Sequence, residues 1–375
     1  MSYWGRNFKI PSPTLQTTNP YGNYTVVDVV TPDMLSRIDA HWYQFPPLNP
    51  MWYGILGFVI SISLVLAAFG NGIVIYIFLT TKSLRTPANF MIINLALADF
   101  CMMSSVSWPM VLNSIWGTWI LGPLGCDIYG MCGSLFGCVA IYSMMFITFD
   151  RYNVIVKGLT TRPPTYKGAF IKISFSWIWC IGWCVAPILG WNRYVPEGNM
   201  TVCGTDYLSE DWLSQSYLYS YGSVCYFVPL IYVIWAYSYI VSTVFAHEKS
   251  MREQAEKMGV KSLRSEESQK MSAEFRLARI ALMTVTLWFI AWTPYCVINF
   301  VGMNNKSYIT PLFSVWGSVF AKLNAIYNPI VYAISHPKYR AALYKKWPCL
   351  SCTTEEESEV DRTTIVTNSS LPKTT

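Results

Sequence analysis

One lysine lies near the middle of an apolar stretch that is long enough to cross a bilayer as a helix. The stretch runs from Thr310 to Ser335, and Lys322 is its only charged residue. An ammonium group at that depth costs about 2.5–3.5 kcal/mol on insertion scales unless it is paired or modified. Two explanations are open. Lys322 pairs with a buried acid for structural or transport reasons, or its amine condenses with an aldehyde ligand to a Schiff base.

Other polar groups in this and other apolar stretches are also candidates for chemistry. Asn328-Pro329 follows six residues after Lys322, and there the proline removes a helical hydrogen bond while the asparagine can bond to the freed carbonyl. Asp99 is the single acid of a second stretch. It is either a water-bound anchor between helices or part of a polar cluster with Asn71 and Asn328 that rearranges when helices move.

Two short motifs have modest interpretations when each is considered alone. Asp150-Arg151 ends a third apolar stretch, where an arginine commonly anchors a helix by extending its charge to the membrane surface. Trp292-Thr293-Pro294 lies in a sixth stretch and indicates a kink in its helix. More specific roles for both motifs depend on the order of all such motifs along the chain.

The composition indicates a protein with several membrane-spanning helices. Of the 375 residues, 53% are hydrophobic and 13% are charged, whereas a soluble protein carries about 25% charged residues. The 16 Trp and 25 Tyr suit the aromatic belts found at membrane interfaces. The net charge of +6 is therefore interpreted loop by loop and does not indicate nucleic-acid binding. With three His and no CxxC…CxxC or HExxH pattern, we expect no metal centre.

The order of apolar and polar segments predicts an all-α membrane protein, a seven-transmembrane helix bundle with a short amphipathic eighth helix. We expect an N-terminal tail over 1–50, the bundle over 51–335, the amphipathic helix over 336–348 and a disordered acidic tail over 349–375. The apolar stretches lie at about 51–80, 87–115, 124–152, 171–189, 217–245, 280–303 and 310–335. The charged segment between the fifth and sixth stretches has helical spacing and should extend both helices into water.

The distribution of basic residues predicts the orientation in the membrane. Lys and Arg gather in the loops of one side, which the positive-inside rule assigns to the cytoplasm, so the N-terminus is expected outside. Cys126 and Cys203 then both lie on the outer, oxidising side, which fits a disulfide. Asn23 and Asn199 lie in outer glycosylation sequons.

The segment after the amphipathic helix contains candidate sites for modification. Cys349 and Cys352 follow the helix directly and are predicted to be palmitoylated. Hydroxyl residues among acids in the tail are predicted phosphorylation sites that recruit arrestin, namely Thr353, Thr354, Ser358, Thr363 and Thr364.

Taken in order, these motifs resemble the rhodopsin-type G-protein-coupled receptors over about residues 50–350. Lys322, six residues before Asn328, narrows the resemblance to the retinal-binding opsins. The loop 191–207 and the segments HPKYRAAL and HEKSMREQAEKMG resemble arthropod visual opsins. The motifs that carry the resemblance are Gly70-Asn71, Leu95-Ala96-Leu97-Ala98-Asp99, Asp150-Arg151-Tyr152, Trp177, Pro229, Trp292-Thr293-Pro294 and Asn328-Pro329-Ile330-Val331-Tyr332.

The resemblance implies 11-cis-retinal bound to Lys322 as a protonated Schiff base. The opsin position for a carboxylate counterion is occupied here by Tyr129, a phenol with a pKa of about 10 that stays neutral. Glu197 is therefore the expected counterion, and Asp127 is expected to point elsewhere. Val106 stands where ultraviolet-tuned opsins carry a lysine, which implies a visible-absorbing pigment. The other implied pocket residues are Gly133, Gly137, Tyr207, Trp292 and Tyr295.

The resemblance also implies a signalling receptor rather than an enzyme, in the plasma membrane of photoreceptor cells, within the rhabdomere. Its expected partners are a Gq-class G protein, arrestin, a receptor kinase and membrane lipid. Arg151, Asp150 and Glu274 are expected to form a polar latch that opens on activation. A counterion held in a loop further implies a bistable pigment. The full set of expected switch residues is Asp150, Arg151, Tyr152, Glu274, Asn328, Pro329 and Tyr332.

Two other functions are considered. A transporter that uses Lys322 as an ion relay predicts internal repeats with broken helices in matching halves, and the sequence shows neither. A receptor for a diffusible ligand would use Lys322 as an ion-pair partner, and it would stay colourless when supplied with 11-cis-retinal.

Overall fold

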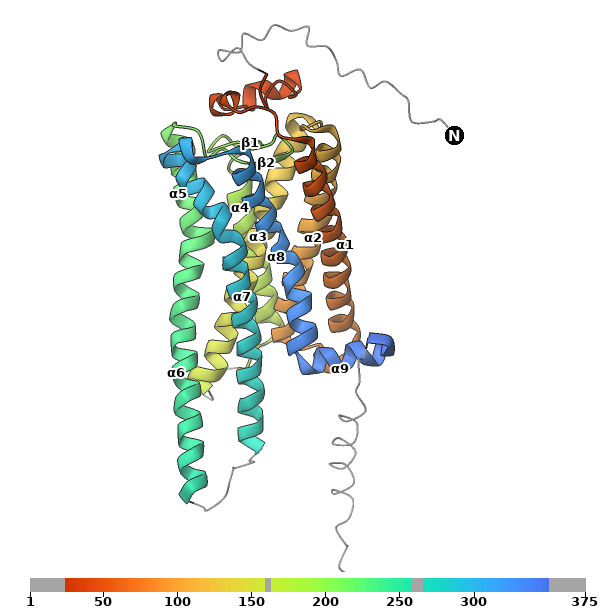
Figure 1. Ribbon diagram of the computed structural model, residues 1–375. Coiled ribbons are helices and arrows are strands. Elements are labelled where there is room, and N and C mark those ends of the chain that lie inside the picture. The colour runs from red at the N-terminus through yellow and green to blue at the C-terminus, as the bar shows by residue number, and fades with distance from the viewer. Residues whose placement is uncertain (1–23, 159–162, 258–265, 351–375) are drawn as a thin grey trace, which may run out of the picture.

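The protein is described by a computed structural model that covers residues 24–158, 163–257 and 266–350, with side chains described from 271 in the last range. Long helices run side by side and form a bundle (Figure 1). Their bounds are α1 Pro50–Thr80, α2 Pro87–Trp116, α3 Gly122–Tyr152, α4 Tyr166–Val185, α5 Trp212–Gly222, α6 Val228–Lys257, α7 Glu266–Asn304 and α8 Pro311–Ser335. A π-helical turn, η6 (Ser223–Phe227), joins α5 to α6, so these three elements form one continuous span.

The bundle contains seven membrane-spanning helices, as predicted. Within the described ranges, six helices are long and apolar enough to cross a membrane by length and composition alone. The seventh is α8, which packs against α1, α2 and α7. Its composition is less apolar because Lys322, Asn324, Asn328 and several serines lie on its buried face. Large apolar side chains such as Phe58 and Leu189 are exposed on the outside of the bundle, as expected for a surface that contacts lipid.

Prolines and polar caps mark where the helices begin. Pro50, Pro87 and Pro311 stand in first turns, where the missing N–H has no helical partner to lose. The side chain of Thr310 accepts a hydrogen bond from the Phe313 N–H at the start of α8. Pro329, in the interior of α8, removes the N–H that would bond to the Ala325 carbonyl.

A short β-hairpin covers one end of the bundle and was not predicted. Strand β1 (Tyr194–Glu197) pairs antiparallel with β2 (Val202–Thr205), with Glu197 opposite Val202, and every residue of both strands is buried. The predicted disulfide joins Cys126 at the start of α3 to Cys203 in β2. These strands have four residues each, which is too short for a clear alternation in the sequence. We call this the hairpin end of the bundle.

Part of the segment expected to be a polar tail is folded. Residues 24–49 include two 3₁₀-helices, η1 (Pro32–Arg37) and η2 (Ala40–Gln44), which lie over the hairpin end (Figure 1). Val26, Met34 and Trp42 are buried in this segment. Their irregular spacing gives no periodic signal, which explains why the sequence did not reveal the fold.

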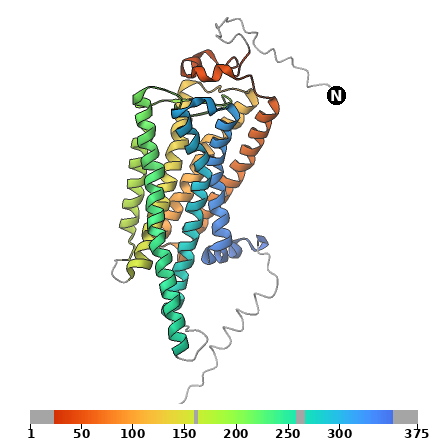
Figure 2. The same ribbon diagram turned by 60° about the vertical axis from the view of Figure 1, so that its left-hand side comes forward.

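At the opposite end, α9 (Pro337–Lys346) runs across the base of the bundle, while α6 and α7 project well beyond it (Figure 2). The short helix corresponds to the predicted amphipathic helix. Its Tyr339 and Leu343 are buried, and Tyr339 stacks on Phe78 of α1 at 5.6 Å between ring centroids. We call this the α9 end.

Candidate functional site

A cavity below the hairpin contains Lys322. Helix α3 contributes Tyr129, Gly130 and Gly133 to its wall, α7 contributes Trp292 and Tyr295, and the hairpin contributes Cys203 and Gly204. Met102, Ser134, Ser318 and Ala321 complete the lining. The cavity is therefore built from the elements that the sequence predicted, with the hairpin as an additional roof.

The amine of Lys322 is buried, with 8% of the residue exposed. Its Nζ donates to Ser318 Oγ at 2.5 Å and to the Ser318 carbonyl at 3.2 Å, and it lies 5.6 Å from the centroid of the Tyr129 ring. Ser318 is one turn before Lys322 on α8, so a residue of the same helix orients the amine. A primary amine with this environment can act as a nucleophile toward a carbonyl ligand.

The Glu197 carboxylate packs against Gly204, a residue that lines the cavity, and 1% of Glu197 is exposed. Its Oε1 accepts a hydrogen bond from the Tyr295 hydroxyl at 2.8 Å, while Oε2 has no hydrogen-bond partner among the described residues. Burial raises the pKa of Glu197 to about 7, against the opposing effects of the Tyr295 hydrogen bond and the charge of Lys322. The amine and the carboxylate therefore interact through space.

Two other residues at this end of α3, Tyr129 and Asp127, have surroundings that differ from those of Glu197. Tyr129 is buried on α3, and its hydroxyl has no hydrogen-bond partner in the described part of the chain. Asp127 forms an ion pair with Arg37 of the N-terminal segment, with 2.5 Å between Arg37 Nη1 and Asp127 Oδ1. This agrees with the expectation that Asp127 lies elsewhere on the helix.

Glycines make room for the groups that meet in the cavity. A Cβ atom on Gly137 would collide with the Trp292 ring, so the indole packs directly on the backbone of α3. A Cβ atom on Gly204 would collide with the Glu197 carboxylate and the Tyr295 hydroxyl. Gly204 was not singled out in the sequence, because nothing in a short unpredicted strand shows which side chain it faces.

The predicted pocket residues separate into three groups. Tyr129, Gly133, Trp292 and Tyr295 line the cavity with Lys322. Gly137 lies behind Trp292 and supports it. Tyr207 lies outside the lining, where its hydroxyl is 2.6 Å from Ser314 Oγ.

The chemistry of the site fits an aldehyde such as retinal, because a buried amine lies among aromatic side chains. Tyr129, Trp292 and Tyr295 line the cavity together with glycines and small side chains, and Trp292 stacks on Trp288 at 5.3 Å between ring centroids. The buried polar atoms Glu197 Oε2, Tyr129 Oη and Trp292 Nε1 have no protein partner within the described ranges. Buried polar groups are normally satisfied, so these atoms indicate a site built around a further group.

A polar cluster lies in the middle of the bundle, between the cavity and the α9 end. Asn328 Nδ2 donates to Asp99 Oδ2 at 2.6 Å. Asn71 Nδ2 donates to the Ala325 carbonyl at 2.8 Å, which is the carbonyl that Pro329 leaves without a helical partner. The expectation that Asn328 serves this carbonyl is therefore wrong, since Asn71 of α1 does so.

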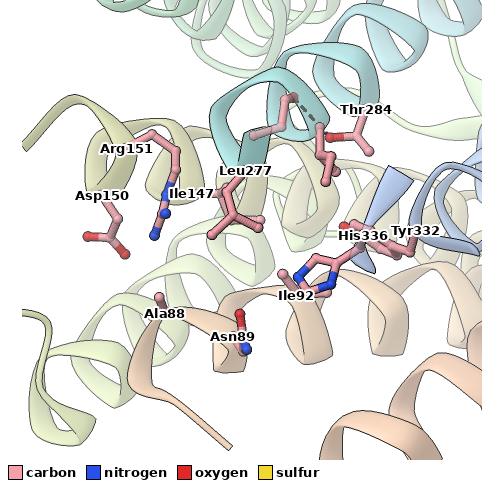
Figure 3. Close-up of a pocket in the computed structure, with 12 residues that line it drawn as sticks. Ala88, Asn89, Ile92, Ile147, Asp150, Arg151, Leu277, Thr284, Tyr332 and His336 are labelled. Carbon is pink, nitrogen blue, oxygen red and sulfur yellow. Dashed lines mark hydrogen bonds between the residues drawn. The ribbon is translucent and has the colours of Figure 1, made fainter. Parts of the chain in front are cut away.

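A second cavity opens at the α9 end (Figure 3). Arg151 and Asp150 line it from α3, and Tyr332 and His336 line it from the end of α8. Arg151 Nη1 lies 2.5 Å from Glu274 Oε2 of α7, which is one contact of the expected latch.

Asp150, the third expected member of the latch, has a different partner. It forms an ion pair with Lys172 of α4, so the charges form two separate pairs, Arg151–Glu274 and Asp150–Lys172. Tyr152 packs on Trp235 of α6 at 4.9 Å between ring centroids. Burial lowers the pKa of His336 to about 4, and its Nδ1 accepts a hydrogen bond from the Tyr339 N–H, which caps α9.

The predicted modification sites are unevenly described. Asn23, Cys352 and the hydroxyl residues of the tail lie outside the described residues. Cys349 is exposed just after α9. Asn199 is fully buried in the hairpin turn, where its Oδ1 accepts a hydrogen bond from Thr201 Oγ1, an environment that argues against a glycan at this position.

Comparisons with known proteins agree with this geometry. Residues 70–332 match the family described as "7 transmembrane receptor (rhodopsin family)". The chain is 61% identical over 344 residues to the long-wavelength rhodopsin of Apis mellifera, covering 92% of this chain and 91% of that one. It is 54% identical over 373 residues to the rhodopsin of Procambarus clarkii, covering 100% and 99%.

A solved structure shows the same fold. The crystal structure of squid rhodopsin matches with a TM-score of 0.80 and 34% identity, covering 91% of this chain and 98% of that one. Both the fold and the sequence thus lead to one conclusion. The chain belongs to the rhodopsin family of seven-transmembrane receptors and, within that family, to the arthropod visual opsins.

Proposed function

We propose that this chain is a light-sensing G-protein-coupled receptor that binds 11-cis-retinal, or a close analogue, through a protonated Schiff base at Lys322. The proposal is carried by one observation: a buried Lys322 amine shares a cavity with Gly204, against which packs the Glu197 carboxylate, whose Oε2 has no partner among the described residues. The relatives named rhodopsin support it. When bound, retinal supplies an aldehyde for condensation with an amine and double bonds that isomerise on absorbing light.

The residues around the amine have distinct roles. Lys322 Nζ is the nucleophile, and Ser318 Oγ orients it toward the cavity through their 2.5 Å hydrogen bond. The amine is buried, which keeps water from the linkage, so Lys322 would keep its bond once formed. Trp292, packed against Gly137 of α3, is the side chain that would register a change in ligand shape and pass it to α7.

Glu197 is the proposed counterion. A positive charge in an apolar site needs a negative partner, because an uncompensated charge would lose its proton. Glu197 would act across a gap, through Tyr295 or water, since its carboxylate accepts a hydrogen bond from the Tyr295 hydroxyl. A carboxylate held by the hairpin stays in place when α7 moves, so we propose that Lys322 keeps both its proton and its bond after illumination. A second photon would then restore the resting form, which makes the pigment bistable.

The cavity at the α9 end is the proposed site of signalling. Breaking the Arg151–Glu274 pair would free α7 to move away from α3 and open this end to a Gq-class G protein. Arrestin and a receptor kinase would follow at the same side, which we infer to be cytoplasmic, with the hairpin end outside. The expected location is the rhabdomeric plasma membrane of photoreceptor cells.

The test measures first the visible absorption spectrum and then the mass of the peptide that contains Lys322. Purified protein supplied with 11-cis-retinal should develop a visible absorption band. After borohydride reduction, the added mass of a retinyl group should appear on the peptide that contains Lys322. Protein that stays colourless would reject light sensing and favour a receptor for a diffusible ligand. Release of free all-trans-retinal within minutes of illumination would reject bistability alone.

A further inference from the structure

Arg37 of the N-terminal segment bonds directly to the hairpin and to α3. Its Nη1 lies 2.5 Å from Asp127 Oδ1 and donates to the Tyr194 carbonyl at 2.9 Å, while Nη2 donates to Asp127 Oδ2 at 2.9 Å. One guanidinium therefore joins three elements, η1, α3 and β1. A planar fork that binds a carboxylate through two parallel bonds fixes both distance and angle.

The carbonyl that Arg37 holds belongs to the first residue of β1. The ring of Tyr194 packs so closely on Gly130 that a Cβ atom there would collide with it, and the Tyr194 hydroxyl donates to the Cys184 carbonyl at 2.9 Å. Glu197 ends the same strand three residues later, at a distance of about 10 Å along the chain for a rise of about 3.3 Å per residue. The start of β1 is thus clamped at the end opposite the carboxylate.

The second strand has a separate anchor. The disulfide between Cys126 and Cys203 fixes β2 to α3, and Asp127, which holds Arg37, is the next residue along α3. The two anchors therefore attach the two strands to the same turn of one helix. Backbone pairing couples β1 to β2, and Arg37 adds a polar link between the start of β1 and α3 beside the packing of Tyr194 on Gly130.

Arg37 is itself held in place by a folded segment. His41 Nε2 lies 2.8 Å from the Ile309 carbonyl, and the Val26 N–H donates to the Phe45 carbonyl at 2.9 Å. Next to Arg37, the Ser36 carbonyl accepts a hydrogen bond from Arg193 at 3.4 Å. Because the backbone around Arg37 is tied to the bundle, the guanidinium can position β1.

We propose that Arg37 is a positioning residue for Glu197: through Asp127 and the Tyr194 carbonyl it fixes β1 so that the carboxylate stays above Lys322. This inference rests on the proposed function for its consequence, the retention of a proton at Lys322. Its structural part, the order of the hairpin, does not depend on retinal.

The first experiment uses protein without retinal. Hydrogen–deuterium exchange is compared for wild type, Arg37→Ala, Arg37→Lys and Asp127→Asn. Arg37→Ala should raise exchange over residues 194–205 at least tenfold, and Arg37→Lys should show a smaller rise because an ammonium cannot form the fork. The control is Lys306→Ala, which removes the ion pair between Lys306 and Asp39 and leaves the Arg37 contacts intact. Unchanged exchange over 194–205 in Arg37→Ala would overturn the proposal.

The second experiment uses protein loaded with 11-cis-retinal. The alkaline midpoint, the pH at which half of the visible absorbance is lost, should fall in Arg37→Ala by about one unit or more as the carboxylate loses its position. The double variant Arg37→Ala/Asp127→Asn should match Arg37→Ala, since both changes remove one interaction. A lower thermal midpoint with an unchanged alkaline midpoint would assign Arg37 a merely structural role and overturn the proposal. If wild type stays colourless, the proposed function fails while the exchange experiment still decides the placement of β1.

Discussion

The two cavities of the bundle differ in how their charged groups are paired. At the hairpin end, Lys322 and Glu197 are buried and interact across a gap, and Glu197 Oε2 has no partner among the described residues. At the α9 end, Arg151 and Glu274 meet at 2.5 Å, with a quarter of the Glu274 side chain exposed. Burying a charged group without a hydrogen-bond partner costs folding free energy unless a further group binds it. Breaking a direct ion pair near solvent costs little free energy. The hairpin end is thus arranged for a ligand and the α9 end for movement.

The strongest test of this comparison removes the amine. Lys322→Ala should abolish covalent retinal binding while the protein still folds, because a buried ammonium contributes no net stability without a close partner. Reduction with borohydride followed by mass measurement should find no retinyl adduct. Lys172→Ala is the matched control, since Lys172 is a half-buried lysine on α4 that pairs with Asp150 at the other end. An adduct on Lys322→Ala protein would show that the amine is not the attachment site.

The next test removes the carboxylate. Glu197→Gln keeps the shape of the side chain and its place opposite Tyr295, but it removes the negative charge. The alkaline midpoint of the visible band should fall by about two units, since the proton at Lys322 loses its compensating charge. Glu210→Gln provides the control, because Glu210 lies in the same loop on the surface, paired with Lys306 at 2.9 Å. Equal midpoints in wild type and Glu197→Gln would place the counterion elsewhere.

A third test uses pH on the protein without retinal. Burial raises the pKa of Glu197 to about 7 in the folded state, above the value of 4.5 for the unfolded chain. Between these two values the folded state binds more protons than the unfolded state, so stability should fall as the pH rises from 4.5 to 7 and level off above that. The lowered pKa of His336 gives a slope of opposite sign below pH 6.5, so the Glu197 contribution is the difference between wild type and Glu197→Gln in matched buffers. Thermal unfolding should show a steeper fall in stability between pH 4.5 and 7 in wild type than in Glu197→Gln, and an identical slope in both would assign the effect to another group.

The sequence predicted the framework well because each prediction depended on composition or on local motifs. The seven apolar stretches and the disulfide follow from residue type and order, whereas the resemblance to opsins implied that Trp292 and Tyr295 lie beside Lys322. The failures share a physical cause, which is contact between segments distant in sequence. Asn71 replaces Asn328 at the Ala325 carbonyl, for example, across 254 residues.

The hairpin and the N-terminal segment show the same limit. Their strands and helices are short, and they gain stability from the bundle below rather than from a periodic pattern of their own. Gly204 could be recognised as part of the site only after β2 was known to face Glu197. The pairing of Asp150 with Lys172 likewise depends on how α4 packs on α3, which no motif in either helix specifies.

The smallest expected effect lies at the α9 end. Glu274→Gln removes the charge that holds Arg151, and because the pair is partly exposed the change should cost the resting state only about 1 kcal/mol. A difference of this size corresponds to a roughly fivefold shift toward the active conformation, given that 1.4 kcal/mol is tenfold. Nucleotide exchange on a Gq-class G protein in the dark should therefore rise about fivefold in Glu274→Gln.

Lys172→Gln is the informative comparison for that variant. Lys172 of α4 binds Asp150, the residue of α3 directly before Arg151. This pair therefore links α3 to α4 and not to the projecting α7. If only the pair that spans α3 and α7 restrains activation, Lys172→Gln should leave dark exchange near the wild-type rate. Equal increases in both variants would mean that the two pairs act as one network, and the α9 end would then resist opening through all the charges around Arg151 instead of through a single contact.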